Sequence, residues 1–393
     1  MKEKPSAFKR VLNIAYRESG ILLTNHIYIF CMVIFPIAII FFFTDLMHDG
    51  QPTEMPVGVV DLDNTSTTRA LTRRLDAFQT SRIAGKYASV DDARQAIQRN
   101  QIYAFIYFPE GMTDDLLSGR QPKISFFYSS TSITAGALLF RDLKTISMLG
   151  SAAVGQATLT AKGLTPEQVK TFLQPIAVDL HAINNPWINY NVYLSSMLIP
   201  GILMLFIFLI TPYSIGTELK FKTNTELMTM ADNDILVAIS GKMIPQTIIN
   251  LIIFYGYMAY VYGHLGFPYH CSTWVLAFVG LISVVASQAF GVFAFGLMPS
   301  LRMSMSICSL WGVLSITTSG FTFPIFAMDA PIQALSFLFP LRHYYMIYQM
   351  CIFNGFPLQE AWLYFAFLAL FILLPLLVMR NLRKALLEYV YIP

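Results

Sequence analysis

The sequence predicts a polytopic α-helical membrane protein with six transmembrane helices, an α/β domain inserted after the first span, and a re-entrant hairpin before the sixth. Three observations lead to this fold class: six long uncharged segments, a polar stretch between the first two of them, and a low content of charged residues. The 393 residues are 55% hydrophobic and only 12% charged, about half the charged fraction of an ordinary soluble domain. The net charge of +3 is too small to favour nucleic acid as a partner.

Each of the six segments is long enough to cross a bilayer as a helix. An α-helix rises 1.5 Å per residue, so roughly 18 to 20 residues cover the hydrocarbon core. Only helices and closed barrels satisfy their backbone groups in lipid, and these segments lack the alternation of barrel strands. The predicted spans are residues 27–44 (26–46 with its flanks), 187–217, 243–263, 271–301, 303–328 and 361–379.

Basic residues set the predicted orientation. If there are six crossings, twelve Lys and Arg residues fall on one side of the membrane, whereas the short opposite connections contain only Arg342. By the positive-inside rule both termini are cytoplasmic, in a multi-pass protein of the inner (plasma) membrane. The insert is then extracytoplasmic, since long translocated domains are exempt from the rule. The twelve are Lys2, Lys4, Lys9, Arg10, Arg17, Lys220, Lys222, Lys242, Arg302, Arg380, Arg383 and Lys384.

Residues 1–25 predict a basic amphipathic helix in the cytoplasmic interface. Apolar side chains recur every three or four residues, with basic and polar side chains between them. An ordinary anchor that precedes the membrane has the same pattern, so both readings stay open. The apolar positions are Phe8, Val11, Leu12 and Ala15.

Residues 47–187 predict the inserted extracytoplasmic α/β domain. Short apolar runs typical of strands alternate with amphipathic stretches, two of which open with the capping residues Ser89 and Thr165. This alternation of strands and helices implies a sheet covered by helices, and the order of the strands stays open. The predicted strands are residues 57–60, 102–108 and 124–128, and the predicted helices contain residues 70–78, 89–97, 109–119 and 133–162, with a further helix from residue 165.

Residues 188–393 predict a five-span membrane domain with two unusual connections. One of them, residues 321–357, is too apolar for a solvated loop, yet its prolines divide it into pieces too short to cross. A crossing there would bury Arg342, and a central Arg costs about 2.5–3.5 kcal/mol on insertion scales. We therefore predict two short re-entrant helices on the outer face, shielded from lipid by other helices. The prolines are Pro324, Pro331, Pro340 and Pro357.

No catalytic, cofactor-binding or metal-binding motif stands out in the sequence. A G-x-x-x-x-G-K-[ST] loop is absent, so no ATP hydrolysis by such a loop is expected, and the six His residues lack ligand spacing. Asp61 and Asp63 are paired carboxylates, but they stand where a strand meets a helix cap, which favours a structural role. We predict that the chain is not an enzyme. A disulfide between Cys271 and Cys351 stays open, because spacing alone cannot bring two Cβ atoms together.

The predicted spans contain no Asp, Glu, Lys or Arg deep inside them. Ion-coupled carriers usually need such a group near the midplane, so this composition argues against a proton-driven or sodium-driven carrier. Interhelical hydrogen bonds and substrate contacts both remain open for the milder polar residues. These are Asn250, Ser283, Ser287, Gln288, Ser304, Ser306 and Ser309.

The second unusual connection, residues 215–240, is a charged cytoplasmic projection with a short helix capped by Asn224 and Thr225. It resembles the coupling loop of the type-2 ABC transporter permease family, six-span exporters with a large extracytoplasmic domain after the first span. Asn224 stands where that family usually has Gly, and the Thr–Glu spacing is one residue tighter. The residues that match in kind are Glu218, Thr225, Glu226, Leu227, Gly241 and Lys242.

Three further segments are similar to the same family. Two lie in the insert, at residues 59–64 and 104–109, and the third is the predicted hairpin. The matching hairpin residues include Gly320, Phe321, Phe323, Pro324, Pro340 and Tyr344. The short pieces between the prolines and their aromatic side chains predict that the hairpin lines the outer end of the export path; a plug that only packs against the helix bundle stays open.

The resemblance implies the permease subunit of an ATP-driven exporter that moves a hydrophobic or amphipathic substrate out of the cytoplasm or inner leaflet. ATP and Mg would be bound by separate ABC ATPase subunits, and this chain would bind no cofactor. A second permease copy or a paralogue would complete the transporter, with a periplasmic adaptor and an outer-membrane channel where the host has an outer membrane. The alternative is a membrane-anchored receptor or cell-envelope scaffold. The ATPase-coupling residues would be Glu218, Asn224, Thr225, Glu226 and Leu227.

Overall fold

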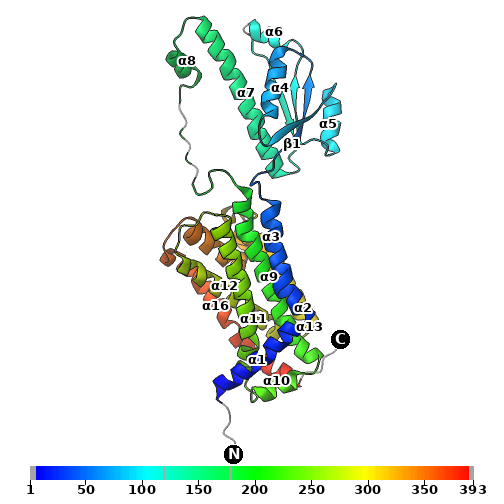
Figure 1. Ribbon diagram of the computed structural model, residues 1–393, viewed down its shortest axis with the longest axis vertical. Helices are drawn as coiled ribbons and strands as arrows, with labels where there is room; N and C mark the ends of the chain where they lie inside the picture. The colour runs from blue at the N-terminus through cyan, green and yellow to red at the C-terminus, as the bar shows by residue number, and fades with distance from the viewer. Residues whose placement is uncertain (1–5, 119, 177–178, 180, 182, 389–393) are drawn as a thin grey trace, which may run out of the picture. The chain divides into compact units, whose positions relative to one another are not determined.

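The computed structural model describes residues 6–118, 120–176, 179, 181 and 183–388 (Figure 1). The chain divides into two compact units. One, here called the membrane unit, combines residues 1–48 with residues 183–393, and the other, the inserted unit, comprises residues 49–182.

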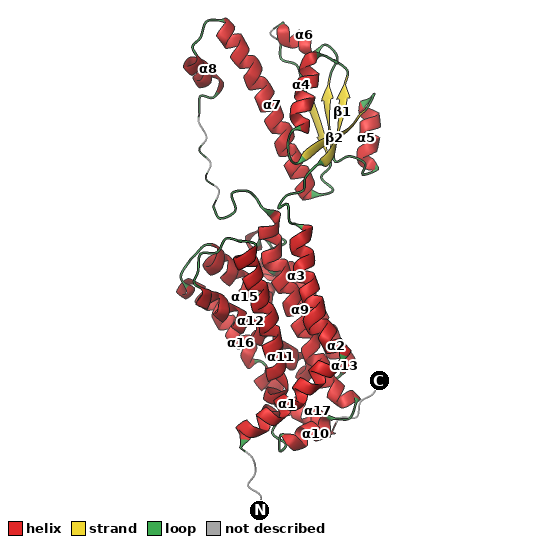
Figure 2. Cartoon of the chain, viewed as in Figure 1, coloured by secondary structure: helices red, strands yellow, loops and turns green. Residues whose placement is uncertain are grey.

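The inserted unit contains a four-stranded sheet in the order β2-β1-β3-β4 (Figure 2). β1 pairs in parallel with both β2 and β3, whereas β4 runs antiparallel to β3. Successive residues of a strand point to opposite faces, so Val59 packs towards α4 and α7 while Val60 packs towards α5. The strands are β1 (Met55–Asp61), β2 (Ser81–Lys86), β3 (Ala104–Phe108) and β4 (Ser125–Tyr128). The helices are α4 (Ser66–Asp76), α5 (Val90–Gln98), α6 (Met112–Leu117), α7 (Ile133–Ala161) and α8 (Pro166–Leu173).

Local signals in the insert are confirmed where they involve caps. The Ser89 side chain accepts a hydrogen bond from the Asp92 backbone at the start of α5, and Thr165 and Gln168 form a capping box at α8. β2 was not predicted, because this edge strand has one large apolar residue, Ile83, and is held by backbone pairing with β1. The prediction that α6 opens at Pro109 is wrong, since the helix follows Gly111 in a left-handed conformation.

The membrane unit contains five helices, among the described residues, that are long and apolar enough to cross a membrane. They are His26–Leu46, Tyr190–Lys220, Ile235–His264, Thr273–Leu297 and Leu358–Glu388. The first combines α2 (His26–Ile29), a π-helical turn η1 (Phe30–Ile34) and α3 (Phe35–Leu46); the others are α9 (Tyr190–Lys220), α11 (Ile235–Met258) with η2 (Ala259–His264), α12 (Thr273–Leu297), and η5 (Leu358–Ala361) with α16 (Trp362–Leu373) and α17 (Pro375–Glu388).

The segment predicted as the fifth span forms a shorter helix, α13 (Leu301–Thr318). It does not extend to residue 328, because the chain turns at Gly320, which has a positive φ of 99°. Arg302 and several hydroxyl side chains lower its apolar content below that of the five helices above. A sixth crossing by α13 therefore stays a prediction.

The predicted hairpin consists of short helical pieces, as its prolines indicated. Pro340 stands at the start of α15, where a missing backbone N–H costs little. Arg342 and His343 are nevertheless buried, so short helical pieces bury these two residues without a full crossing. The pieces are η3 (Ile325–Ala327), α14 (Ala330–Ser336), α15 (Pro340–Ile347) and η4 (Tyr348–Phe353).

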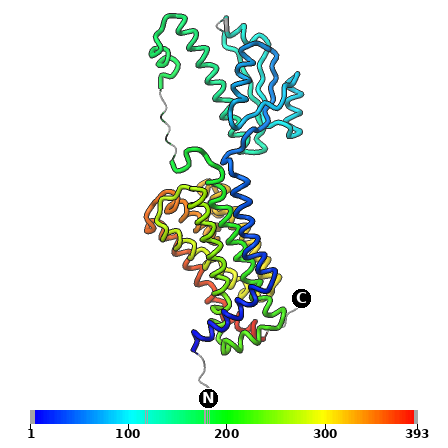
Figure 3. Tube along the Cα trace, in the orientation of Figure 1, coloured from blue at the N-terminus to red at the C-terminus, as the bar shows by residue number. Residues whose placement is uncertain are grey.

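The N-terminal helix α1 (Ala7–Thr24) packs against α11 (Figure 3). The predicted helix is confirmed, and residues of its apolar face, which is predicted to lie in the membrane interface, are exposed on the protein. Phe8 and Leu12 are exposed, whereas Ile14, Glu18 and Leu22, spaced four residues apart, are buried. This helix therefore has an exposed apolar face and a packed face that includes a charge.

Candidate functional site

The residues after α9 form the short helix α10 (Asn224–Met230), which has one exposed and one buried face. Thr225, Glu226 and Thr229 are exposed. Leu227 is fully buried, and the Asn224 side chain donates a 2.7 Å hydrogen bond to the carbonyl of Leu386 in α17. The expectation that Asn224 and Leu227 form part of a solvated contact surface is therefore wrong. They attach α10 to the rest of the membrane unit.

Left-handed turns bound α10 at both ends. Lys222 precedes it with φ of 59°, and Asp232 and Asn233 follow it with φ of 58° and 59°. Such values are uncommon outside Gly, Asn and Asp. The turns fix where α10 begins and ends, and hence which of its side chains face outwards.

Glu218 lies in a buried ion cluster rather than on the projecting loop where the sequence placed it. It is 3% exposed. Both carboxylate oxygens accept hydrogen bonds from Arg17 of α1, at 2.9 and 3.1 Å, and Oε1 also accepts one from Lys242 of α11 at 2.8 Å. Thr223 donates a further hydrogen bond to Glu218. The carboxylate thus joins α1, α9 and α11.

Lys242 is the centre of this cluster. Its ammonium group is 1% exposed and donates to Glu18 at 2.6 Å as well as to Glu218. Glu18 also accepts hydrogen bonds from Gln246 at 3.0 Å and from Ser214 at 3.1 Å. Two carboxylates face two cations, so the cluster is neutral and its charges are paired, as burial requires.

The cluster reaches the exposed face of α10 through Arg17. Its Nε lies 3.4 Å from a carboxylate oxygen of Glu226, which is 60% exposed. Burial on its own would lower the pKa of Arg17, but hydrogen bonds and charge attraction to Glu218 and Glu226 raise it above the ordinary value. Arg17 therefore stays charged and connects an exposed carboxylate to a buried one.

Gly241 explains why α1 can lie so close to α11. A Cβ atom at this position would lie 2.7 Å from Cβ of Ile14 and 3.0 Å from the carbonyl oxygen of Val11. The absence of a side chain brings the Glu18 carboxylate within reach of Lys242, one residue further on. Gly241 and Lys242 thus act together in this contact.

Sequence reasoning missed Arg17, Glu18 and Gln246, and the buried Glu218 and Lys242 stand just outside the predicted spans 187–217 and 243–263. α9 and α11 extend beyond their apolar runs and so include Glu218 and Lys242. At a rise of 1.5 Å per residue, Lys242 lies about 10 Å from Ile235, the first residue of α11. It is therefore near the start of that helix. One signal was present: Glu18 has the four-residue spacing of Ile14 and Leu22.

The hairpin residues divide into a buried and an exposed set. Phe321, Pro340 and Tyr344 are buried, whereas Phe323 and Pro324 are exposed. Gly320 allows the tight turn after α13, since a Cβ there would lie 2.5 Å from the Ile325 side chain.

Comparison with known families gives one match along most of the chain. Residues 26–379 match the model of the ABC-2 family transporter proteins. The chain belongs to the ABC-2 family. A comparison with curated proteins gives no match.

Membership of this family makes the protein a membrane permease of an ABC transporter. Such a permease is a transport subunit that is not itself catalytic, and it implies an ABC ATPase as partner.

Among the described residues, no three His, Cys, Asp or Glu side chains gather as metal ligands. Asp61 accepts a hydrogen bond from the Asn64 backbone, and Asp63 accepts from Thr65 and Thr113. Slight burial raises the pKa of Asp63, but these hydrogen bonds lower it below its ordinary value. The two carboxylates order a turn.

Three of the seven polar residues that stand out inside the predicted spans bond within their own helix. Ser287, Ser304 and Ser306 each donate to a backbone carbonyl four residues earlier. Gln288 is different, because it contacts Met243 and Thr247 across to α11. Hydrogen bonding within the protein therefore accounts for these four residues.

Cys271 and Cys351 are free thiols, so the disulfide left open by the sequence does not form.

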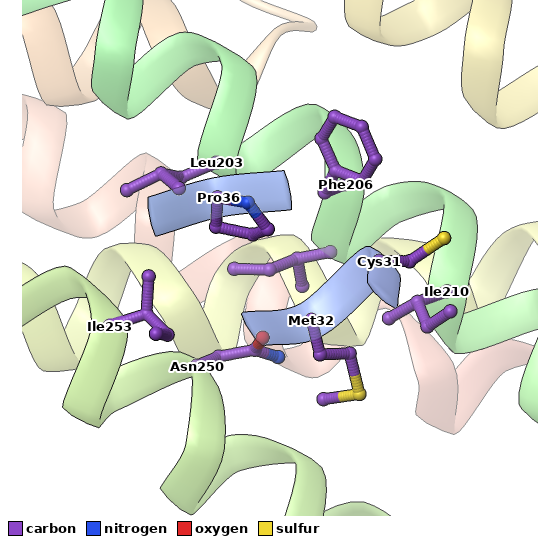
Figure 4. A pocket seen from close by; sticks show the side chains of 9 residues that line it. Cys31, Met32, Pro36, Leu203, Phe206, Ile210, Asn250 and Ile253 are labelled. Carbon is purple, nitrogen blue, oxygen red and sulfur yellow. The ribbon is translucent and has the colours of Figure 1, made fainter. Parts of the chain in front are cut away.

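Asn250 of the permease faces a small cavity of about 10 Å³ between the first span, α9 and α11 (Figure 4). Its amide nitrogen is buried without a hydrogen-bond partner among the described residues. The π-helical turn η1 lies beside it, just before Pro36, whose ring cannot continue regular helical bonding. A cavity of this size holds about one water molecule, so it is too small for a transported substrate.

Proposed function

We propose that this permease is the membrane subunit of an ATP-driven exporter that moves a hydrophobic or amphipathic substrate out of the cytoplasm or inner leaflet. The observation that carries the proposal is the connection from the exposed face of α10, through Arg17, to the buried Glu218–Lys242 cluster. An ATPase seated on Phe221, Thr225 and Glu226 would press on a helix that cannot move independently of the spans.

Further contacts support this transmission. Besides the Asn224 hydrogen bond to α17, Arg10 of α1 donates a 2.8 Å hydrogen bond to the carbonyl of Ala231, just after α10. α10 is therefore attached to α1 and α17 as well as to α9 and α11. Rigid-body shifts of packed helices are a common route by which a local contact changes a membrane protein between two packings.

Copurification tests the proposal. We expect an affinity-tagged permease, expressed with the genes of its own host, to copurify with a subunit that has a G-x-x-x-x-G-K-[ST] loop and hydrolyses ATP. A folded permease that retains a partner through its inserted unit but no such ATPase would instead favour the receptor or scaffold function.

A second copy of the permease, or a paralogue, is proposed to cover α13. Its exposed face carries the hydroxyl residues Ser306, Ser309 and Thr317 among apolar residues such as Leu310 and Val313, whereas a helix facing lipid alone would present mainly apolar side chains. This hydroxyl-bearing face, together with the exposed hairpin residue Phe323, suits a path for an amphipathic substrate between two copies.

A groove in the inserted unit supports the docking of an adaptor or other external partner. It has a volume of about 1180 Å³ and is lined by residues of α4 and α7, near the contact of Leu71 with Gly150. Apolar residues such as Leu116 line it together with the basic Arg74 and Lys123. A receptor or scaffold could use the same groove, which is why the ATPase test decides between the two functions.

The proposed topology has six crossings, both termini in the cytoplasm, and the inserted unit and the hairpin outside. Exposed tryptophans support it. Trp187 precedes α9, Trp274 stands in the first turn of α12, and Trp362 begins α16. These three helix starts lie at the outer face in this topology, and Trp is enriched at membrane interfaces.

Thiol labelling tests this topology. In a cysteine-free background, we expect Asp91→Cys and Phe326→Cys to react with an impermeant thiol reagent in cells whose outer membrane, if present, has been permeabilised. Thr225→Cys and Leu387→Cys should react only after the inner membrane is disrupted. All four sites are exposed, Phe326 at 93%, so poor access within the fold cannot explain protection. Labelling of Thr225→Cys in intact cells, or protection of Phe326→Cys, would contradict the arrangement of the corresponding segment.

A further inference from the structure

Arg342 of α15 is a buried cation without a counter-ion among the described residues. It is 5% exposed, and its Nε and Nη1 atoms are fully buried with no hydrogen-bond partner. No carboxylate of the described residues lies within ion-pairing distance of it. Buried charges in proteins are normally paired, so an unpaired guanidinium indicates a missing partner.

The side chains around Arg342 hold it in place without neutralising it. Its guanidinium carbon lies 4.3 Å from the ring centre of Phe337, in a cation–π contact. His343 bonds through Nε2 to the carbonyl of Phe337 at 2.8 Å and stacks on Phe367 with ring centres 4.7 Å apart. The Phe337 ring thus covers one face of the guanidinium, and the hydrogen bond and the stacking hold His343 beside it; none of these contacts neutralises the charge of Arg342.

The site lies beside apolar surface. The neighbouring Leu335 and Leu338 are exposed, and α16, which packs against α15, is largely exposed and apolar. A partner with an acyl chain on this surface could bring a headgroup to the edge of Arg342. A guanidinium has a planar fork of donors that matches a phosphate group with two parallel hydrogen bonds.

We propose that Arg342, held against the ring of Phe337, is the binding site for the phosphate group of an anionic amphiphile. The phosphate oxygens accept hydrogen bonds from the two terminal guanidinium nitrogens, one of which, Nη1, now lacks an acceptor, and the acyl chains lie against the apolar surface of α16. The site does not depend on the ATPase partner or on the export function.

Thermal unfolding of the purified permease in detergent tests this site. We expect dioleoyl phosphatidylglycerol to raise the Tm by several degrees more than dioleoyl glycerol, which has the same chains but no phosphate. Arg342→Gln should lose at least half of this difference, and Arg342→Lys, which keeps the charge but not the fork, should lose less. Arg302→Gln is the matched control, since Arg302 is exposed at the start of α13, and it should retain the full difference.

Inorganic phosphate separates the two sources of the ligand. A Tm increase with inorganic phosphate alone, absent in Arg342→Gln, would assign the site to free phosphate, whereas an increase with the lipid alone assigns it to a headgroup. Equal Tm values with the two dioleoyl lipids in the wild type would overturn the proposal even if Arg342→Gln does not fold. An equal loss in Arg302→Gln and Arg342→Gln would also overturn it, because the effect would then be one of general charge.

Discussion

Replacing Lys242 with methionine is expected to destabilise the membrane unit by about 3–5 kcal/mol, the cost of removing one partner from a buried ion pair. Lys242 contacts both Glu18 and Glu218. Without it, Glu218 keeps its pair with Arg17, whereas the buried Glu18 keeps only hydrogen bonds from Ser214 and Gln246 among the described residues. The Tm of the purified protein, or its yield of folded material by size-exclusion chromatography, measures the effect.

Two further variants separate the loss of pairing from the loss of a side chain. Lys220→Met is the matched control, because Lys220 is exposed at the end of α9, and its stability should change by less than about 1 kcal/mol. The double variant Lys242→Met with Glu18→Gln restores a neutral cluster and should recover part of the lost stability. A Lys242→Met protein as stable as Lys220→Met would show that the cluster does not hold α1 to α11.

Replacing Glu226 with arginine is expected to abolish coupling to the ATPase while the permease stays folded. Glu226 is 60% exposed, and its contact with Arg17 is a partly solvated ion pair, which contributes at most about 1 kcal/mol. Reversing its charge at a protein interface costs far more, because like charges are brought together. We expect at least a tenfold loss of copurified ATPase or of transport.

Glu226→Gln is the control for this experiment, since it removes the pair with Arg17 without reversing the charge. It should retain most ATPase binding. Leu227 should not be changed in the same test, because it is fully buried and a polar residue there would disturb folding. If Glu226→Arg binds the ATPase and transports like the wild type, the exposed face of α10 is not the coupling surface.

Much of the local structure could be predicted because its signals lie close together in the sequence. The caps at Ser89 and Thr165 stand beside the helices they begin, and Gly163, with φ of 86°, follows the end of α7. Five apolar runs became helices long enough to span. The short helix α10 is also confirmed, at the place where the sequence put the coupling loop.

The ion cluster could not be predicted, because its members are far apart along the chain. Arg17 and Glu218 are about two hundred positions apart, and no local pattern indicates that they meet. Glu18 and Lys242 each look like an ordinary charged residue next to a membrane segment. Only the packing of α1 on Gly241 brings Glu18 and Lys242 together. Burying either charge alone would be unfavourable, but burying them as a pair is tolerated.

The two faces of α10 have a consequence for how such permeases diversify. The inward side chains, Asn224 and Leu227, are bound to α17 and the helix bundle, whereas Thr225, Glu226 and Thr229 touch the outside. If the ATPase is seated on the outer face, as proposed, substitutions there would alter the recognised ATPase without shifting the inner face, because left-handed turns fix the length of the helix. Partner choice and membrane architecture can thus evolve through separate residues of a single two-turn helix, provided that Arg17 keeps an acidic neighbour.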